Sequence, residues 1–269
     1  MDPPKDNTHE YPPPRMARKA MLRFHSREGP VKLGGMSGSS SIPSLPADWP
    51  YPPRGAAGEP RSCPGAAIHG LGSGWDLRLQ AGLSLEGAMG ALAGAFGRGG
   101  ILRLGEVVVR PYRRGGLVRH VNERIYASPD RFAREFAVHR ALWTAGFPTV
   151  EPLGYGSRRR AWGVEGVFLT RFAEAKAWPA CWERSADVLP QVAVMLKALA
   201  SWGLLAPDLN ATNFLLTPEG RVLALDWDRA RWTGGGDLLA RYRERLARSL
   251  RKLRAPRDVL EAFAGSPAG

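Results

Sequence analysis

Two short apolar runs, 213–217 and 221–225, constrain the fold most, because they flank a Pro-Glu-Gly turn and predict a β-hairpin. Antiparallel pairing around that turn places Asn213 beside the end of the second strand, one step before Asp226. Asp208 lies in the loop that enters the first strand. We therefore expect the three polar side chains to converge at one end of the hairpin.

This trio suits a complex of ATP and magnesium, because Mg²⁺ takes oxygen ligands and keeps only one or two protein carboxylates besides phosphate oxygens. Asp208 and Asn213 have the five-residue spacing of the base and the metal-binding Asn in kinase catalytic loops, and Asp226 follows a turn and a strand later. The sequence predicts phosphoryl transfer, with Asp208 as catalytic base and with Asn213 and Asp226 as magnesium ligands. A polar loop with an Asp-capped turn is the alternative interpretation.

Residues before the hairpin follow the order of a kinase nucleotide site. Gly97, Gly99 and Gly100 precede a predicted hairpin and are candidates to cover ATP phosphates with backbone amides. Arg110 ends the next strand, where kinases place the phosphate-binding Lys, and Glu135 lies in the following helix, where the pairing Glu belongs. The alternatives are a simple glycine turn, a solvated cation at Arg110 and a solvated helix face at Glu135.

The remaining pattern predicts an α+β chain in which a sheet with one helix precedes a mainly helical region. Expected strands cover 101–104, 106–110 and 163–172, and expected helices cover 84–96, about 128–145, 186–202 and 237–253, the last of these strongly basic.

The first 70 residues differ from the rest, because they are rich in Pro, Gly and Ser and show no sustained period. We predict a disordered tail over 1–70, a sheet-containing lobe over 71–172 and a reduced, mainly helical lobe over 173–269. Together these form a two-lobed, protein-kinase-like fold with its hinge near 170–173.

The net charge of the chain limits the kinds of partner that it favours, but it does not identify one of them. A net charge of +13 favours anionic partners, such as an acidic membrane surface, a phosphorylated substrate or nucleic acid. Nucleic acid ranks lower, because aromatic residues are not interleaved with the cations. The two cysteines and five histidines show no zinc spacing. No export signal or membrane-spanning stretch is recognisable, so a cytoplasmic location is expected.

Four motifs, in this order, resemble those of the bacterial lipopolysaccharide core kinases, and above all the 3-deoxy-D-manno-octulosonic acid (Kdo) kinases. They are Arg110-Pro-Tyr-Arg-Arg-Gly-Gly116, Arg134-Glu135-Phe136, Asp208-Leu-Asn-Ala-Thr-Asn213 and Leu225-Asp-Trp-Asp-Arg229. The resemblance covers about residues 95–255. It implies phosphorylation of a sugar hydroxyl, on Kdo or another inner-core sugar of a lipopolysaccharide precursor. The protein would then act peripherally at the inner face of the bacterial inner membrane.

The chain departs from that family at the catalytic loop. Ala206 and Pro207 stand where the family has His and Ala, and Thr212 replaces a second His. Asp228 matches the family, and we interpret it as a brace for the loop. Two alternatives stay open: another small-molecule kinase of aminoglycoside or choline type, and an inactive pseudokinase that serves as a basic membrane-bound scaffold.

Overall fold

A computed structural model of the chain describes residues 54, 60–68, 71–80, 101–113, 124–233 and 236–265. The helix predicted over 84–96 lies outside the described residues, as do Gly97, Gly99 and Gly100.

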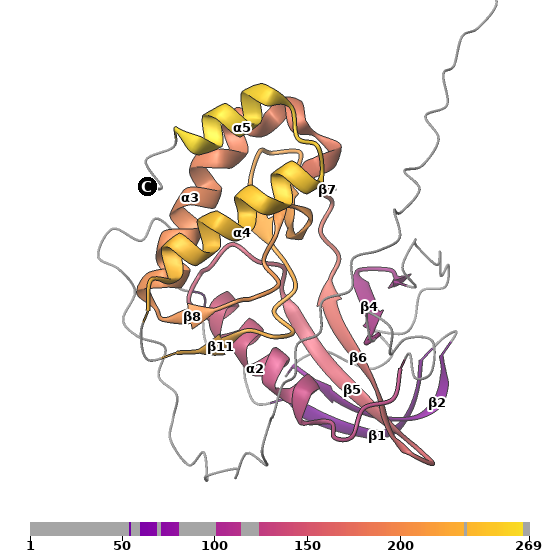
Figure 1. Cartoon of the computed structure of the whole chain (residues 1–269). Coiled ribbons are helices and arrows are strands. Elements are labelled where there is room, and N and C mark those ends of the chain that lie inside the picture. Colours follow the sequence, from indigo (N-terminus) through magenta and orange to yellow (C-terminus); the bar gives the residue numbers. More distant parts are fainter. Residues whose placement is uncertain are drawn as a thin grey trace, which may run out of the picture. The chain divides into compact units, whose positions relative to one another are not determined.

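A six-stranded sheet contains most of the strand residues, and each neighbouring pair in it is antiparallel. Its order is β1-β2-β5-β6-β4-β3 (Figure 1). Both edge strands contribute to the same buried cluster as the central strands, so the sheet curls around one core. The strands are β1 (Arg61–Ile68), β2 (Gly72–Leu79), β3 (Leu102–Leu104), β4 (Val107–Pro111), β5 (Pro152–Arg160) and β6 (Gly163–Arg171).

The alternation of side chains along β4 decides where Arg110 points. Val107 and Val109 belong to the core that the sheet encloses, so Arg110 has the opposite parity and lies on the other face. It is directly opposite Phe168 of β6, which packs in a separate aromatic cluster with residues of helix α2 (Asp130–Thr144). Arg110 and α2 therefore share one face of the sheet.

Helix α2 begins and ends as its sequence predicts. The backbone N–H of Asp130 donates to Ser128 Oγ at 3.1 Å, and Gly146 has a φ of 81°, a left-handed conformation that stops the helix. The backbone N–H of Arg54 donates to the carbonyl oxygen of Thr144 at 2.8 Å, a group at the C-terminal end that has no partner within the helix.

The prediction of a disordered tail over 1–70 is wrong for the C-terminal part of that range. Arg61–Ile68 forms β1, and Arg54 bonds to the end of α2. β1 contains Pro and Gly, which disfavour strands, and it forms because pairing with β2 buries Ala66 and Ile68. Sequence patterning also missed β2 and β5.

Three mutually contacting helices, α3 (Ser185–Ser201), α4 (Leu238–Lys252) and α5 (Arg257–Ala264), surround a second core (Figure 1). The helix predicted over 237–253 is confirmed as α4, but it is not the last helix. α5 follows it and buries Val259 and Phe263. None of the helices in the described part of the chain combines the length and apolarity needed to cross a bilayer.

The hairpin predicted over 213–225 is confirmed, with the predicted register. β9 (Phe214–Leu216) pairs with β10 (Val222–Ala224), and the N–H of Leu225 donates to the carbonyl oxygen of Asn213 at 2.8 Å. Asn213 itself ends a 3₁₀ turn just before β9. The short strands β7 (Lys176–Ala177), β8 (Leu204–Leu205) and β11 (Arg231–Trp232) lie around the hairpin, with β7 beside β9 and β8 paired with β11.

Candidate active site

A cavity of about 230 Å³ lies where the α2 face of the sheet meets the end of the β9–β10 hairpin. We call Arg110 and Glu135, with Tyr112 bonded behind them, its sheet side, and we call Asn213 and Asp226, with the neighbouring Asp208, its loop side. The lining residues are Ile101, Val108, Arg110, Glu135, His139, Phe168, Thr170, Asn213, Leu225 and Asp226. The structure thus brings together residues that are more than 100 positions apart in the sequence.

The sheet side is centred on Glu135, which is only 1% exposed. Its Oε1 accepts a hydrogen bond from Arg110 at 2.5 Å, and its Oε2 accepts one from the hydroxyl of Tyr112. Burial raises the pKa of Glu135 to about 7, and the positive charge of Arg110 offsets part of that effect. Burial also disfavours the charged form of Arg110, but the carboxylates of Glu135 and Asp226 outweigh it and raise the pKa of the guanidinium.

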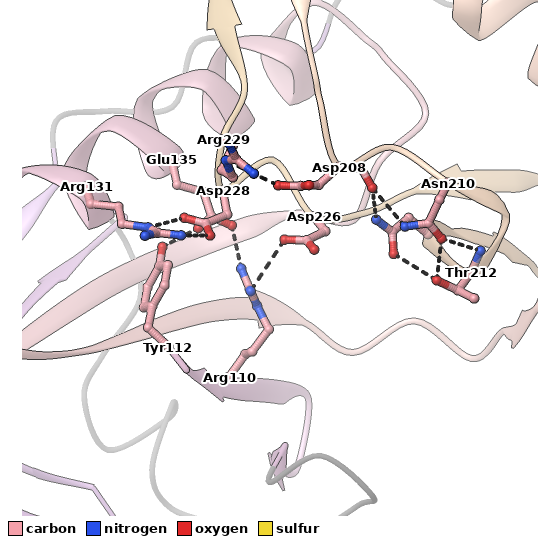
Figure 2. A network of polar contacts seen from close by, with 11 residues as sticks. Arg110, Tyr112, Arg131, Glu135, Asp208, Asn210, Thr212, Asp226, Asp228 and Arg229 are labelled. Carbon is pink, nitrogen blue, oxygen red and sulfur yellow. Dashed lines mark hydrogen bonds and ion pairs between the residues drawn. The ribbon is translucent and has the colours of Figure 1, made fainter. Parts of the chain in front are cut away.

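Arg110 joins the two sides of the cavity. Its second terminal nitrogen lies 3.5 Å from Oδ1 of Asp226, so one guanidinium contacts a carboxylate on each side (Figure 2). The pairing of Arg110 with Glu135 has the geometry that the sequence predicted. A solvated helix face at Glu135 is wrong, and so is a freely solvated Arg110.

The loop side is less completely bonded. Asp226 has a φ of 67°, a left-handed conformation that is uncommon outside glycine, and its buried Oδ1 accepts no hydrogen bond from the described residues. Burial raises the pKa of Asp226, and the negative charges of Asp228 and Asp208 add to the effect that Arg110 opposes. The Asn213 side chain donates to the carbonyl oxygen of Asp208 at 2.9 Å, which keeps the loop side together.

These groups fit a magnesium ion that shares its coordination with phosphates. No group of three or more Asp, Glu, His or Cys residues able to hold a metal occurs within the described ranges. The Asp226 carboxylate and the Asn213 amide oxygen would supply only part of a shell, as is usual for Mg²⁺ bound with a nucleotide. A cation would also stabilise the charge of Asp226, whose ionised form burial disfavours.

Thr149, which sequence reasoning missed, bonds to the chain on both sides of Asp226. The Thr149 hydroxyl donates to the carbonyl oxygen of Ala224 at 2.7 Å and accepts from Trp227 Nε1 at 3.1 Å. His139 Nε2 lies 2.9 Å from the same hydroxyl. The predicted core position of His139 is confirmed, and burial lowers its pKa to about 3. Nothing in the local sequence marks Thr149, because its partners are distant along the chain.

Asp228 was predicted to brace the catalytic loop, but its hydrogen bonds go to helix α2. Its Oδ1 accepts a hydrogen bond from Nε of Arg131 at 2.7 Å, and its Oδ2 accepts a second one from the same guanidinium. Figure 2 shows this pair beside the sheet side of the cavity. Arg131 lies in the first turn of α2, so the pair ties the segment after β10 to the helix that carries Glu135.

Helix α4 supports the loop around Asp208. The N–H of Ala206 donates to the hydroxyl of Tyr242 at 2.9 Å, and the N–H of Ala211 donates to Oγ of Ser249 at 3.1 Å. Arg245 donates to the carbonyl oxygen of Leu209 at 3.1 Å. Three points of α4 therefore hold the loop around Asp208 in place.

The comparisons with known proteins agree with these motifs. Residues 84–253 match the model of the lipopolysaccharide kinase (Kdo/WaaP) family, and the chain belongs to that family. It is 32% and 31% identical, over 171 residues, to the 3-deoxy-D-manno-octulosonic acid kinases of Xylella fastidiosa strains M12 and 9a5c. The match covers 58% of this chain and 66% of each relative, just under two thirds of their length.

A solved structure of a kinase is also similar. It is described as a divergent kinase that lacks the glycine-rich loop. That kinase regulates membrane ultrastructure of the Toxoplasma parasitophorous vacuole. Identity is 19%, the TM-score is 0.40, and the match covers 64% of this chain and 61% of the other. That likeness is too weak to support a conclusion.

Proposed function

We propose that this protein is an ATP- and Mg²⁺-dependent kinase that phosphorylates a sugar hydroxyl, on Kdo or another inner-core sugar, of a lipopolysaccharide precursor. The observation that carries the proposal is the cavity in which Arg110, paired with the buried Glu135, faces Asn213 and Asp226. In this proposal the sheet with α2 and the helical part are the two lobes of a protein-kinase-like fold, with the hinge near 170–173.

The cavity has the two parts that a nucleotide needs. Ile101, Val108 and Leu225 give it apolar walls, and Ile101 is 39% exposed, which is high for a large aliphatic side chain. The charged and amide groups of Arg110, Asn213 and Asp226 are in the same cavity. We place the base of ATP against the apolar walls and its phosphates near the polar groups. The glycines at 97, 99 and 100 stay predicted phosphate contacts.

When bound, ATP supplies the phosphoryl group and Mg²⁺ offsets the charge of the phosphates. Arg110, fixed by Glu135, would contact the phosphates, while Asn213 and Asp226 would hold the metal. Asp208 accepts the proton of the sugar hydroxyl. The oxygen of that hydroxyl forms a bond to the γ-phosphorus, and the bond from that phosphorus to ADP breaks. Arg245 at 3.4 Å and Arg229 at 3.7 Å orient the Asp208 carboxylate.

Mass spectrometry tests this function directly. The full chain is incubated with ATP, Mg²⁺ and a lipid A precursor that bears Kdo, alongside Asp208→Ala. The expected result is the gain of one phosphate on the sugar, lost in the variant. Absence of transfer by the wild type would contradict the proposal. If ATP and Mg²⁺ also failed to raise the melting temperature, the scaffold alternative would be favoured.

A further inference from the structure

A second hollow, separate in its lining from the nucleotide cavity, lies between α4 and the loop of Asp208. It has a volume of about 370 Å³, and we call it the basic groove. Its lining residues are Asn210, Thr212, Arg245, Arg248, Ser249, Lys252 and Leu253.

One wall of the basic groove is a row of cations. Arg245, Arg248 and Lys252 are spaced by three and four residues, so they share one face of α4. Arg248 pairs with Glu244, and both side chains of this pair are well exposed. Lys252 is exposed and forms no ion pair with any residue in the described part of the chain. The groove therefore keeps positive charge available for a ligand.

The other wall is the catalytic loop itself. Asn210 and Thr212 both lie within the Asp208–Asn213 motif, and the Asn210 side chain donates to the carbonyl oxygen of Asp208 at 2.8 Å. Arg245 belongs to the groove and also lies 3.4 Å from Oδ1 of Asp208. A ligand in this groove is therefore a neighbour of the residue proposed as the base.

We propose that the basic groove binds an anionic group, a carboxylate or a phosphate, of the acceptor, and so brings the acceptor's hydroxyl to Asp208. This subsite rests on the proposed function, because it assumes that Asp208 receives an acceptor. The sugar acid in the names of the Xylella relatives carries a carboxylate, which is one such group. Cations in a recess bind such oxygens through charge-assisted hydrogen bonds.

An anionic lipid headgroup has the same chemistry, and the placement of the cations favours the acceptor. A bilayer attracts cations on an exposed surface and needs no recess to bind them. Arg251 and Arg241 are exposed on the same helix but do not line the groove. The cations that line the groove are those next to the catalytic loop, which favours the acceptor as the ligand.

Two adjacent residues give a matched test. Lys252 lines the groove and Arg251 does not, while both are exposed, positively charged and in the last turn of α4. Lys252→Ala should raise the KM for the lipid A precursor that bears Kdo by about tenfold and leave the KM for ATP unchanged. Arg248→Ala should act in the same direction. Arg251→Ala should change both KM values less than twofold, by about the effect of an exposed charge.

Two further measurements distinguish an anionic group of the acceptor from an anionic lipid headgroup. With the lipid chains removed from the acceptor, the Lys252→Ala effect on KM should persist. With vesicles of anionic phospholipid and no acceptor, Lys252→Ala and Arg251→Ala should weaken binding equally. An effect that disappears with the delipidated acceptor would overturn the proposal in favour of a lipid headgroup, and so would equal KM changes in the two variants.

Failure of the proposed function would look different. If the wild type transferred no phosphate, equilibrium binding of the delipidated, Kdo-bearing acceptor would be measured instead. Weaker binding by Lys252→Ala than by Arg251→Ala would support the groove as a site that binds anions. It would do so even though the proposed reaction had failed. Equal binding would overturn it.

Discussion

The two sides of the cavity proposed to bind ATP differ in how completely their polar groups are bonded. On the sheet side, both oxygens of the buried Glu135 accept hydrogen bonds within the protein. On the loop side, Oδ1 of Asp226 accepts none from the described residues, and the Asp208 side chain is 33% exposed. A buried polar group that is already bonded contributes to the fold, whereas one left unsatisfied is available to a ligand. We therefore expect the sheet side to stabilise the site and the proposed chemistry to take place on the loop side.

Backbone conformation shows the same difference. Arg110 and Glu135 lie on a regular strand and a regular helix, but Asp226 has a left-handed φ of 67°. Such a conformation persists only where surrounding contacts hold it, here through Thr149. Substitutions on the two sides should consequently separate activity from stability.

The largest effect is expected on the loop side. Asp208→Asn should lower the rate of phosphate transfer by about 10²- to 10⁴-fold, because it removes a positioned base. Its ion pairs with Arg245 and Arg229 are long and partly exposed, so the free energy of unfolding should change by less than about 1 kcal/mol. Transfer assays and urea titrations on the same preparation measure both quantities. A variant that kept the wild-type rate would remove Asp208 from the mechanism.

Loss of the buried carboxylate on the sheet side should mainly affect the fold. Glu135→Ala leaves Arg110 without its closest partner and should reduce the free energy of unfolding by about 3–5 kcal/mol. Arg134→Ala is the control, since Arg134 is the exposed neighbour on the same helix. Chemical denaturation measures the difference. Equal losses in the two variants would mean that the Arg110–Glu135 pair does not stabilise this side.

A smaller effect is expected from the hydroxyl of Tyr112. Tyr112→Phe removes one hydrogen bond to the Glu135 carboxylate and should cost about 1.5 kcal/mol of stability. Tyr155→Phe is the matched change, because the Tyr155 hydroxyl makes no hydrogen bond among the described residues. If thermal unfolding showed the same shift for both, the hydroxyl would have no special role.

A separate and more specific effect is a pH dependence of stability from Glu135. Burial raises its pKa from 4.5 to about 7, so the folded state binds this proton more tightly than the unfolded chain does. The stabilising contribution is complete below about pH 4.5 and is lost as the pH rises through about 7.

Urea titrations at a series of pH values, for the wild type and Glu135→Gln, isolate this contribution. The wild-type advantage in free energy of unfolding should decrease across that window. His139 gives a slope of opposite sign, because burial lowers its pKa to about 3, but it is present in both proteins and cancels. A difference independent of pH would contradict the raised pKa.

The sequence predicted the loop side better than it predicted the rest of the fold. Asp208, Asn213 and Asp226 are close in the chain, and one turn sets the register that brings them together. By contrast, β1 has a poor strand sequence and forms only because β2 pairs with it. Thr149 could not be predicted as a support for Asp226, because its contacts depend on the tertiary fold.

The basic character of α4 was evident from the sequence, but its relation to the catalytic loop was not. Tyr242, Arg245 and Ser249 bond to backbone groups more than 30 residues earlier in the chain. Periodicity identifies the buried face of a helix, but it does not identify the loop that the helix contacts.

The most direct test of the difference between the two sides is the unfolding of Asp226→Asn, with and without ATP and Mg²⁺. Asn tolerates the left-handed backbone of Asp226, so the substitution removes charge without adding strain. The account predicts that the variant is as stable as the wild type without ligand, and that ATP with Mg²⁺ stabilises only the wild type. A variant that unfolded more easily alone, yet was stabilised normally by ATP and Mg²⁺, would contradict it.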